Sequence, residues 1–500
     1  MSATPDVVPD GTPDDASSTP AARVVARNTA LRAAAEVLGK LATLALTVVM
    51  LRQLGAGAVG DFGVALAISQ LYWPIAGFGL DRLMLREIAV DDAAKARMVP
   101  QLNAFKLVIG LLCTLVGTAG MALYNPDSDE VVLVTLLLSL GLVATLIGAT
   151  AQTVFMAKER TQDYFVAALP VKVLGAILGI AALAVGGGIV AVATTNLFAA
   201  VMGVALGWWI LARRYDQPPA TLAGNPRTWW SLARTAGPWG VQEIFGQVMF
   251  RVGIIVLYLY AGRQVAGEYR VAYQLLEATL FLPWSIATSI LPLIARSKRG
   301  VSEHGEPTLE AVTRGSIELV IALMLPIAIL LGLCAEPILA LLGKDAAPAV
   351  EFLPYLAAAS VVYGVGHMAG IVGLTHLPGR RTIEVTAIAA LFSVAAVALL
   401  IPAQEGKGAA IAALATELVL TGLSLGLAVK VAGAEILRSA ASVGVVSGLA
   451  MAAVVYPLRD HLVFAVIAGG AVYLIVLLAL EYRRQGPAWM LARSVLPGSR

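Results

Sequence analysis

Long apolar stretches alternate with short polar segments from residue 23 to residue 484. A helix that crosses the hydrocarbon core of a membrane needs about 20 mostly apolar residues, and the chain contains about 14 such windows. Their centres lie near Leu41, Ser69, Leu112, Val143, Gly175, Val201, Val248, Leu280, Met324, Val361, Ala390, Leu418, Val446 and Tyr473. The pattern predicts an all-α integral membrane protein with about 14 transmembrane helices.

The first two segments recur at segments seven and eight without a gap. Glu36, Gly39, Gly55, Gly60, Asp61, Phe62, Val64 and Ala65 align with Glu243, Gly246, Gly262, Gly267, Glu268, Tyr269, Val271 and Ala272. The copies start six helices apart, an even number, so they share an orientation, and such repeats are typical of transporters. We expect two parallel six-helix lobes, related by a pseudo-two-fold axis along the membrane normal, plus two C-terminal helices. Gly55 and Gly60, like Gly262 and Gly267, are expected to bracket tight outer turns.

The polar segments between the apolar runs indicate the domain boundaries. Residues 1–22, rich in Pro, Ser, Thr and Asp, are expected to form a disordered cytoplasmic tail without a signal peptide. The remaining units are expected to be the N-terminal six-helix lobe at 23–212, a cytoplasmic linker at 213–236, the C-terminal six-helix lobe at 237–432, helices 13 and 14 at 433–484, and a cytoplasmic tail at 485–500.

Charge adds an orientation and excludes several functions. Charged residues make up 13% of the chain and hydrophobic residues 59%. Most of the 35 Lys and Arg residues fall in one set of alternate loops, which the positive-inside rule places in the cytoplasm with both termini. Arg52, Arg263 and Arg270 are assigned to the opposite loops. We expect a multi-pass protein of a bacterial inner (plasma) membrane, in contact with membrane lipids.

No enzyme, cofactor or nucleic-acid signature is present. A phosphate-binding Gly-rich loop and a His/Cys cluster with metal-ligand spacing are both missing from the sequence. Cys113 and Cys334 lie in apolar runs and are expected to be small core residues. The sequence therefore predicts a protein that is not an enzyme, with no cofactor, no metal and no nucleic-acid partner.

The first hairpin carries a recognisable pattern. It reads Asn28, Gly39, Leu-Arg-Gln-Leu-Gly at 51–55, Gly60, Phe62, Gly-Phe-Gly-Leu at 77–80 and Arg86-Glu87. This pattern resembles the polysaccharide and oligosaccharide flippases of the multidrug/oligosaccharidyl-lipid/polysaccharide exporter superfamily. The resemblance implies two lobes that form a V around a central cavity. It also implies a polyprenyl-diphosphate-linked glycan as substrate, passed from the cytoplasmic to the outer leaflet.

Charged residues inside the spans are the candidate site, because an intramembrane charge is costly and is usually retained for a function. Glu36 and Lys40 share a face of segment one, and Glu243, Gln247 and Arg251 follow the same stripe on segment seven. We expect the two stripes to face each other across the cavity. Lys40 and Arg251 would attract the diphosphate, while Glu36 and Glu243 hold them. On the alternative interpretation, Glu36–Lys40 and Glu243–Arg251 are only neutralised pairs.

Other polar positions complete the candidate site. Gln70 and its repeat mate Glu277 are assigned to the cavity, and a weaker group comprises Gln152, Lys172, Asn196 and Arg270. His367 could titrate near neutral pH, and Glu277 or Glu417 could carry a coupling proton, although a lone histidine on an apolar helix more often serves packing. His367 and Glu417 are therefore the candidate coupling residues. The cytoplasmic end of segment two is expected to set topology and an inner gate through Asp81, Arg82, Arg86 and Glu87.

The predicted function is translocation of polyprenyl-diphosphate-linked oligosaccharide or polysaccharide repeat units by alternating access. Glycosyltransferases or a polymerase of the same pathway are possible partners. Three alternatives stay open: a flippase for lipid II, the peptidoglycan precursor; a cation-coupled multidrug exporter; and a non-transporting scaffold of a polysaccharide-assembly complex. The exporter predicts an acidic cavity, whereas Lys40 and Arg251 make this one at least balanced.

Overall fold

A computed structural model describes residues 20–126, 128–215, 222, 224–297, 308–377 and 379–484. The expected tails at 1–22 and 485–500 lie almost wholly outside these residues, as does part of the linker at 213–236. The described chain is helical throughout, with no strand. Its helices are α1 (Pro20–Gly77), α2 (Leu80–Val90), α3 (Ala94–Tyr124), α4 (Asp129–Ala157), α5 (Thr161–Leu169), the π-helix η1 (Pro170–Leu174), α6 (Gly175–Ala184), α7 (Ile189–Arg214), α8 (Pro226–Thr279), α9 (Phe281–Arg296), α10 (Leu309–Leu333), α11 (Ala335–Leu342), the 3-10 helix η2 (Lys344–Glu351), α12 (Leu353–His376), α13 (Gly379–Ala432), α14 (Glu435–Leu458) and α15 (Leu462–Arg484).

Length and composition make 10 helical stretches of the described residues able to cross a membrane. The apolar runs of the sequence form these helices because a helix satisfies its own backbone hydrogen bonds where water is absent. Val443–Leu458, within α14, is a shorter apolar helix. The all-helical membrane architecture predicted from the sequence is therefore confirmed.

Three of the longest helices contain a non-helical residue at which the chain reverses. These residues are Gly55 in α1 with φ 81°, Gly262 in α8 with φ 82°, and Glu405 in α13 with φ 46°. Glycine adopts positive φ without the steric penalty that a Cβ brings, so the repeat-related Gly55 and Gly262 suit these turns. The hairpin role expected for those two glycines is confirmed.

The expectation that Gly60 and Gly267 also belong to the turns is wrong. Both lie inside helices, where α1 and α8 cross at very close range. A Cβ added to Gly60 would overlap the carbonyl oxygen of Arg263 and lie 2.9 Å from the backbone nitrogen of Gly267. A Cβ added to Gly267 would overlap the carbonyl oxygen of Ala56. We call this backbone contact between the two repeats the glycine clasp.

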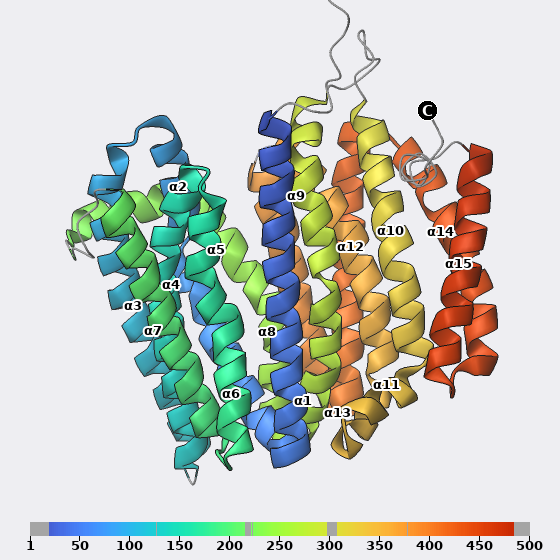
Figure 1. Cartoon of the computed structure of the whole chain (residues 1–500), viewed down its shortest axis with the longest axis horizontal. Helices are drawn as coiled ribbons and strands as arrows, with labels where there is room; N and C mark the ends of the chain where they lie inside the picture. The colour runs from blue at the N-terminus through green and yellow to red at the C-terminus, as the bar shows by residue number, and fades with distance from the viewer. Residues whose placement is uncertain are drawn as a thin grey trace, which may run out of the picture.

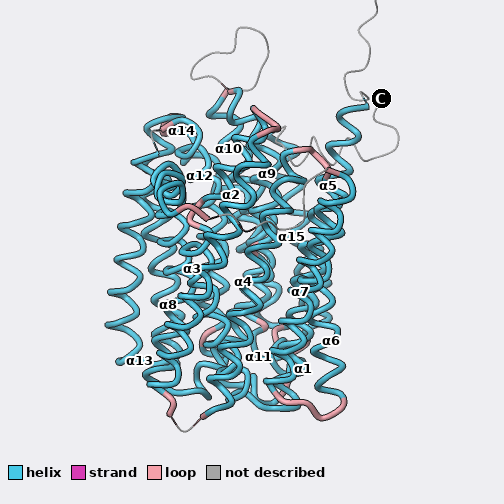
Figure 2. The backbone as a smooth tube through the Cα atoms, turned by 90° about the vertical axis from the view of Figure 1, so that its left-hand side faces the viewer, coloured by secondary structure: helices cyan, strands magenta, loops and turns pink. Residues whose placement is uncertain are grey.

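The clasp lies at one end of the helix bundle, and the first and last described residues lie at the other (Figure 1). Figure 1 shows α1 beginning and α15 ending at the same end, which we call the terminal end. The reversals of α1 and α8 lie at the opposite, far end. In Figure 2 the helices run side by side between these ends, and the connecting turns gather there.

Helices α2–α7 stand on one side of the molecule and α9–α15 on the other, with the first half of α1 and parts of α8 between them (Figure 1). Buried apolar side chains follow this arrangement. One cluster joins α2, α3, α4 and α7, and another joins α9, α10, α12 and α13. A third links both sides through α1 and α8. α14 and α15 pack against α10, where the Tyr473 hydroxyl donates to the carbonyl oxygen of Ala322 at 2.9 Å.

Candidate functional site

Charged side chains from both halves of α8 meet inside the bundle. The reversal at Gly262 brings the second half of α8 back beside the first, so that Arg251 faces Glu277. Arg251 Nη1 lies 2.8 Å from Glu277 Oε1, and Arg270 Nη1 lies 3.0 Å from Oε2 of the same carboxylate. Arg270 Nη2 donates to Gln274 Oε1 at 2.6 Å. Arg270, Gln274 and Glu277 share one face of the helix, which lets a single carboxylate bridge two guanidinium groups.

These four residues form what we call the central cluster, and it is shielded from solvent. The exposed fractions of the side chains are 14% for Arg251, 8% for Arg270 and 9% for Glu277. The positive charge of Lys40, on the first half of α1, also acts on Glu277. Among the residues that the structure describes, Lys40 makes no hydrogen bond or ion pair. Two arginines contact the one carboxylate and Lys40 adds a third positive charge in the neighbourhood, so the described side chains here carry an excess of positive charge.

A cavity with about 240 Å³ of empty space adjoins the central cluster. Gln70, Arg251 and Arg270 line it, together with aromatic and small residues of α1 and α8. Within the described chain, two buried polar atoms of the lining residues lack a hydrogen-bond partner, Gln70 Oε1 and Arg251 Nε, and so does Gln247 Oε1 one turn earlier on α8. A buried polar atom without a partner costs free energy, so the place is prepared for a polar ligand or for water.

Two details of the sequence-based site are corrected. The pair Glu243–Arg251 does not form, because eight residues along a helix separate the two by about 12 Å. Glu243 instead lies 3.1 Å from Arg82 Nε of α2. Arg270 is not in a loop either: it is buried in the second half of α8. The side chain of Glu36 lies outside the described residues, so the pair Glu36–Lys40 stays a prediction.

Residues 25–298 match the model of a protein family described as "Polysaccharide biosynthesis protein". The chain belongs to this family. The match covers more than half of the chain and confirms the resemblance seen in the first hairpin. A comparison of the chain with curated proteins finds no match.

Solved structures share the fold of this chain. The lipid II flippase MurJ in an inward closed conformation has a TM-score of 0.72 and 13% identity, covering 92% of this chain and 99% of that one. An inward-facing multidrug resistance transporter of the MATE family, in the MOP superfamily, has a TM-score of 0.62 and 14% identity, covering 80% and 96%. A MOP superfamily transporter from Pyrococcus furiosus has a TM-score of 0.57 and 14% identity, covering 80% and 94%. These likenesses show that the chain shares its fold with membrane transporters of known structure.

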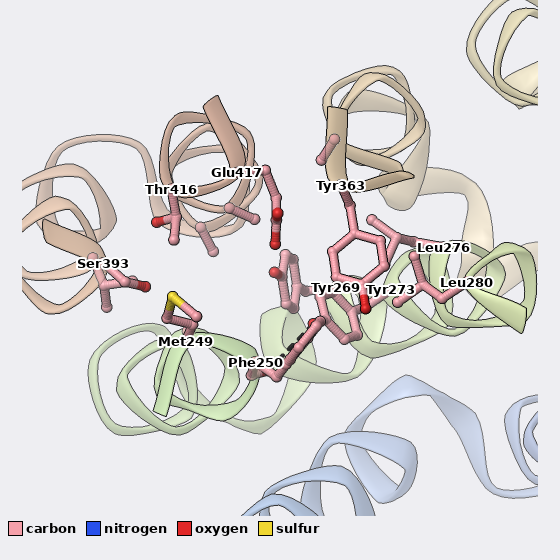
Figure 3. Close-up of a pocket in the computed structure, with 15 residues that line it drawn as sticks. Met249, Phe250, Tyr269, Tyr273, Leu276, Leu280, Tyr363, Ser393, Thr416 and Glu417 are labelled. Carbon is pink, nitrogen blue, oxygen red and sulfur yellow. Dashed lines mark hydrogen bonds between the residues drawn. The ribbon is translucent and has the colours of Figure 1, made fainter. Parts of the chain in front are cut away.

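The two candidate coupling residues lie around Tyr363 but line separate cavities. His367 stacks between Trp284 and Tyr363, with ring centroids 5.2 and 5.5 Å away. Glu417 lines a different cavity, with about 520 Å³ of empty space. Figure 3 shows its side chain extending from α13 toward the rings of Tyr269, Tyr273 and Tyr363. Among the described residues, Glu417 Oε2 has no hydrogen-bond partner.

The weaker group of sequence candidates divides into three places. Gln152 and Lys172 line a cavity among α2, α4 and α5, together with Asp81, Arg82 and Glu243. Asn196 lies in the packing of α4 against α7, with its Oδ1 close to Gly141. Arg270 joins the central cluster. The tyrosines around Glu417 were missed, because aromatic residues at helical spacing usually indicate core; the cluster of Tyr269 and Tyr273 four residues apart was the available signal.

Proposed function

We propose that this protein translocates a lipid-linked glycan with an anionic diphosphate headgroup across a bacterial inner membrane by alternating access. The observation that carries the proposal is the excess of buried positive charge around Glu277. A buried charge without a partner is strongly unfavourable, so a site with surplus guanidinium and ammonium groups favours an anionic occupant. Arg251 and Arg270 suit a diphosphate because the planar guanidinium binds phosphate oxygens in pairs.

We infer that the polypeptide crosses the membrane about 14 times. The hairpins in α1, α8 and α13 each supply two spans, and α14 supplies one more. The terminal end would face the cytoplasm, in agreement with the positive-inside pattern. The two repeats would form parallel lobes at 23–212 and 237–432, joined by the linker at 213–236, and α14 and α15 would brace the second lobe through α10.

Alternating access follows from the glycine clasp. The clasp holds the two repeats together at the far end, while the cluster lies between them toward the terminal end. The substrate would approach the cluster from the cytoplasm. Its anionic group would pair with Lys40 and accept a hydrogen bond from Arg251 Nε. Parting of the clasp would then expose the same cluster to the outer leaflet. Gln70 and Gln247 would add polar contacts.

The coupling role belongs to the second repeat. Glu417 sits in a cavity with three tyrosines and one unpartnered carboxylate oxygen, and His367 lies close by. We propose Glu417 as the residue that takes up and releases the coupling proton or cation, with His367 as a packing partner of Trp284 and Tyr363. Energy from an ion gradient would then reach the substrate cavity through Tyr273, which lies beside both sites.

The carried glycan has two candidates. Membership of the polysaccharide biosynthesis family favours a surface polysaccharide unit, and the fold shared with the lipid II flippase favours a peptidoglycan precursor. Both present a diphosphate to the same cationic cluster. Glycosyltransferases or a polymerase that make and consume the glycan are the proposed partners.

The test is translocation of a fluorescent polyprenyl-diphosphate oligosaccharide in proteoliposomes. Wild type is compared with Lys40→Gln, Arg251→Gln and Arg270→Gln at matched levels of folded protein. Arg381→Gln is the control, because Arg381 forms an exposed ion pair with Glu384 far from the cluster. The proposal expects transport by wild type and the control and its loss in the three variants. Transport of a cationic dye but not of the glycan by wild type would support the multidrug exporter, and no transport of either would support the scaffold.

A further inference from the structure

A larger cavity lies among α1, α2, α4, α5 and η1, and α8 contributes Glu243 to its lining. Its empty space is about 990 Å³. The polar and aromatic side chains that line it are Trp73, Arg82, Gln152, Thr153, Tyr164 and Lys172, with Asp81 and Glu243 at its edge. The cavity shares no lining residue with the cavity at the central cluster. It is therefore a separate place in the fold.

A buried lysine fixes the edge of this cavity. Lys106 is fully buried and bonds to Asp81 Oδ1 at 2.6 Å, to Thr150 Oγ1 at 2.9 Å and to the carbonyl oxygen of Leu146 at 3.1 Å. The ammonium group donates three bonds, so Lys106 has no donor left for another ligand. Its effect is to hold Asp81 against α3 and α4. The next residue along α2, Arg82, is thereby fixed at the mouth of the cavity.

The backbone before Arg82 is fixed as well. Phe78 and Gly79 both have positive φ, 43° and 69°, and Gly79 lies directly against α8. A Cβ on Gly79 would lie 2.8 Å from the backbone nitrogen of Gly240, so only glycine fits there. This is the Gly-Phe-Gly-Leu sequence at 77–80. Its kink starts α2 in the direction that brings Arg82 within reach of Glu243 on α8.

Arg82 keeps part of its binding capacity free. Its Nε lies 3.1 Å from Glu243 Oε1, and half of its side chain is exposed. Within the described chain, neither of its Nη groups has a hydrogen-bond partner. Two coplanar nitrogens are what a phosphate group needs for paired hydrogen bonds. The half-exposed ion pair with Glu243 is itself weak, because solvent screens it.

Lys172 provides a second cation in the lining of the cavity. It lies in the π-helix η1, a geometry that is rare and often found at functional sites. The stem of Lys172 packs against Gly39 of α1, where a Cβ would lie 3.2 Å from Lys172 Cβ. Gln152, Thr153 and Tyr164 add an amide and two hydroxyl groups, and Trp73 adds an aromatic face. Amides, hydroxyls and an aromatic ring suit the polar group that a phosphate carries.

We propose that this cavity is a second anion subsite, which binds a phosphate-bearing group through Arg82 and Lys172 in competition with Glu243. The subsite extends the proposed function, on which it rests, because it would receive the headgroup on the cytoplasmic side before the central cluster does. Glu243 acts as a built-in competitor: it keeps Arg82 paired when the subsite is empty. Glu243 and Arg251 share one face of α8. When Glu243 is displaced from Arg82, the helix that carries the central cluster loses this contact with α2.

The experiment measures binding at equilibrium, which does not require translocation. The full chain in nanodiscs of neutral phosphatidylcholine is titrated with inorganic pyrophosphate and, separately, with a short-chain prenyl diphosphate. Binding is followed by calorimetry and by the fluorescence of Trp73. The contribution of Trp73 is identified by comparison with the Trp73→Phe variant. Arg82→Gln and Lys172→Gln should each weaken binding about 10- to 100-fold, as expected for lost bonds to a charged ligand. Arg381→Gln is the control.

The Glu243→Gln variant guards against misfolding as an explanation. It should tighten binding about two- to fivefold, and a damaged protein would not bind more tightly. Binding of pyrophosphate itself would identify a site for free phosphate groups, and binding of the prenyl diphosphate alone would identify a lipid headgroup site. Binding that depends on Arg251 but not on Arg82 or Lys172, or no binding of either probe, would overturn the proposal. Loss of translocation with binding intact would instead count against the proposed function.

Discussion

Replacing Gly60 by alanine adds one methyl group at the glycine clasp. The new Cβ would overlap the carbonyl oxygen of Arg263 and lie 2.9 Å from the nitrogen of Gly267. Both neighbours are backbone atoms of α8, so no side chain can rotate away to make room. The methyl group fits only if α1 and α8 move apart at the far end of the bundle.

The size of the effect follows from this geometry. Overpacking by one or a few methylene groups costs about 1–3 kcal/mol. Here the cost falls on the state with the clasp closed and not on the state with the clasp open, so the equilibrium between them shifts about 5- to 150-fold toward opening. The helix itself gains about 0.5–1 kcal/mol when glycine becomes alanine. A weaker α1 therefore cannot explain the opening.

The shift can be measured as a distance across the far end. Spin labels are placed at Val185, after α6, and at Leu341, in α11, both of which are exposed. Cys113 and Cys334 are first replaced by alanine, because both are free thiols. In nanodiscs, pulsed electron resonance should give one short distance between the two labels in the protein that keeps Gly60. In Gly60→Ala a second, longer distance between the labels should appear. Gly267→Ala should do the same, because its Cβ would overlap the carbonyl oxygen of Ala56.

Gly246→Ala is the matched control. It lies on α8 at the repeat position of Gly39, and a Cβ there would meet no atom within 4 Å. The reasoning is refuted if Gly60→Ala keeps the wild-type distance distribution, or if Gly246→Ala shifts it equally.

Three further predictions concern other parts of the chain. Glu277→Gln leaves Arg251 and Arg270 buried without a carboxylate and should destabilise the protein by about 3–5 kcal/mol, measured as thermal unfolding in detergent. Glu417→Gln should destabilise it much less. Equal losses of stability in the two variants would contradict the ion-pair argument. In the turn between α2 and α3, a hydrogen bond from Lys158 holds the pKa of Asp92 below its usual range, with a further bond from Lys95. The contacts of Asp92 with Lys158 and Lys95 should therefore persist from neutral pH to about pH 4 and be lost as the pH falls through the lowered pKa of Asp92. Hydrogen exchange of residues 91–94 should show this opening in acid. The Asp92→Asn variant should have an open turn at every pH. Tyr473→Phe removes the bond to Ala322 and should lower the unfolding free energy by about 1 kcal/mol without reducing translocation, whereas a loss of transport would give α15 a direct role.

Several features of this fold were readable from the sequence because they repeat. Gly55 and Gly262 occupy equivalent positions before equivalent apolar segments, and both turn the chain. The sequence also indicated that Arg251 and Glu277 belong to one buried site. Membrane insertion makes such predictions strong, because intramembrane charges have few acceptable environments.

The pairing of those charges was not readable. Glu243 and Arg251 share a helix face, yet their separation along the axis leaves each with a partner on another segment. Arg270 is a basic residue close to the turn at Gly262, and the sequence therefore indicated a loop position. The fold instead buries it against Glu277. Gly60 and Gly267 look like turn residues because a sequence does not show which glycine meets another backbone. Each of these outcomes depends on how the two repeats cross, which is a property of tertiary packing.

The glycine clasp has a consequence for the ancestry of the chain. Ala56 and Arg263 are equivalent residues of the two repeats, as are Gly60 and Gly267. Gly60 meets Arg263 while Gly267 meets Ala56, so each repeat offers the other the same patch. A contact of this kind is isologous, the form that joins two identical subunits about a two-fold axis. A single unduplicated copy would thus have carried its own dimer interface, and gene fusion would have preserved a homodimer within one polypeptide.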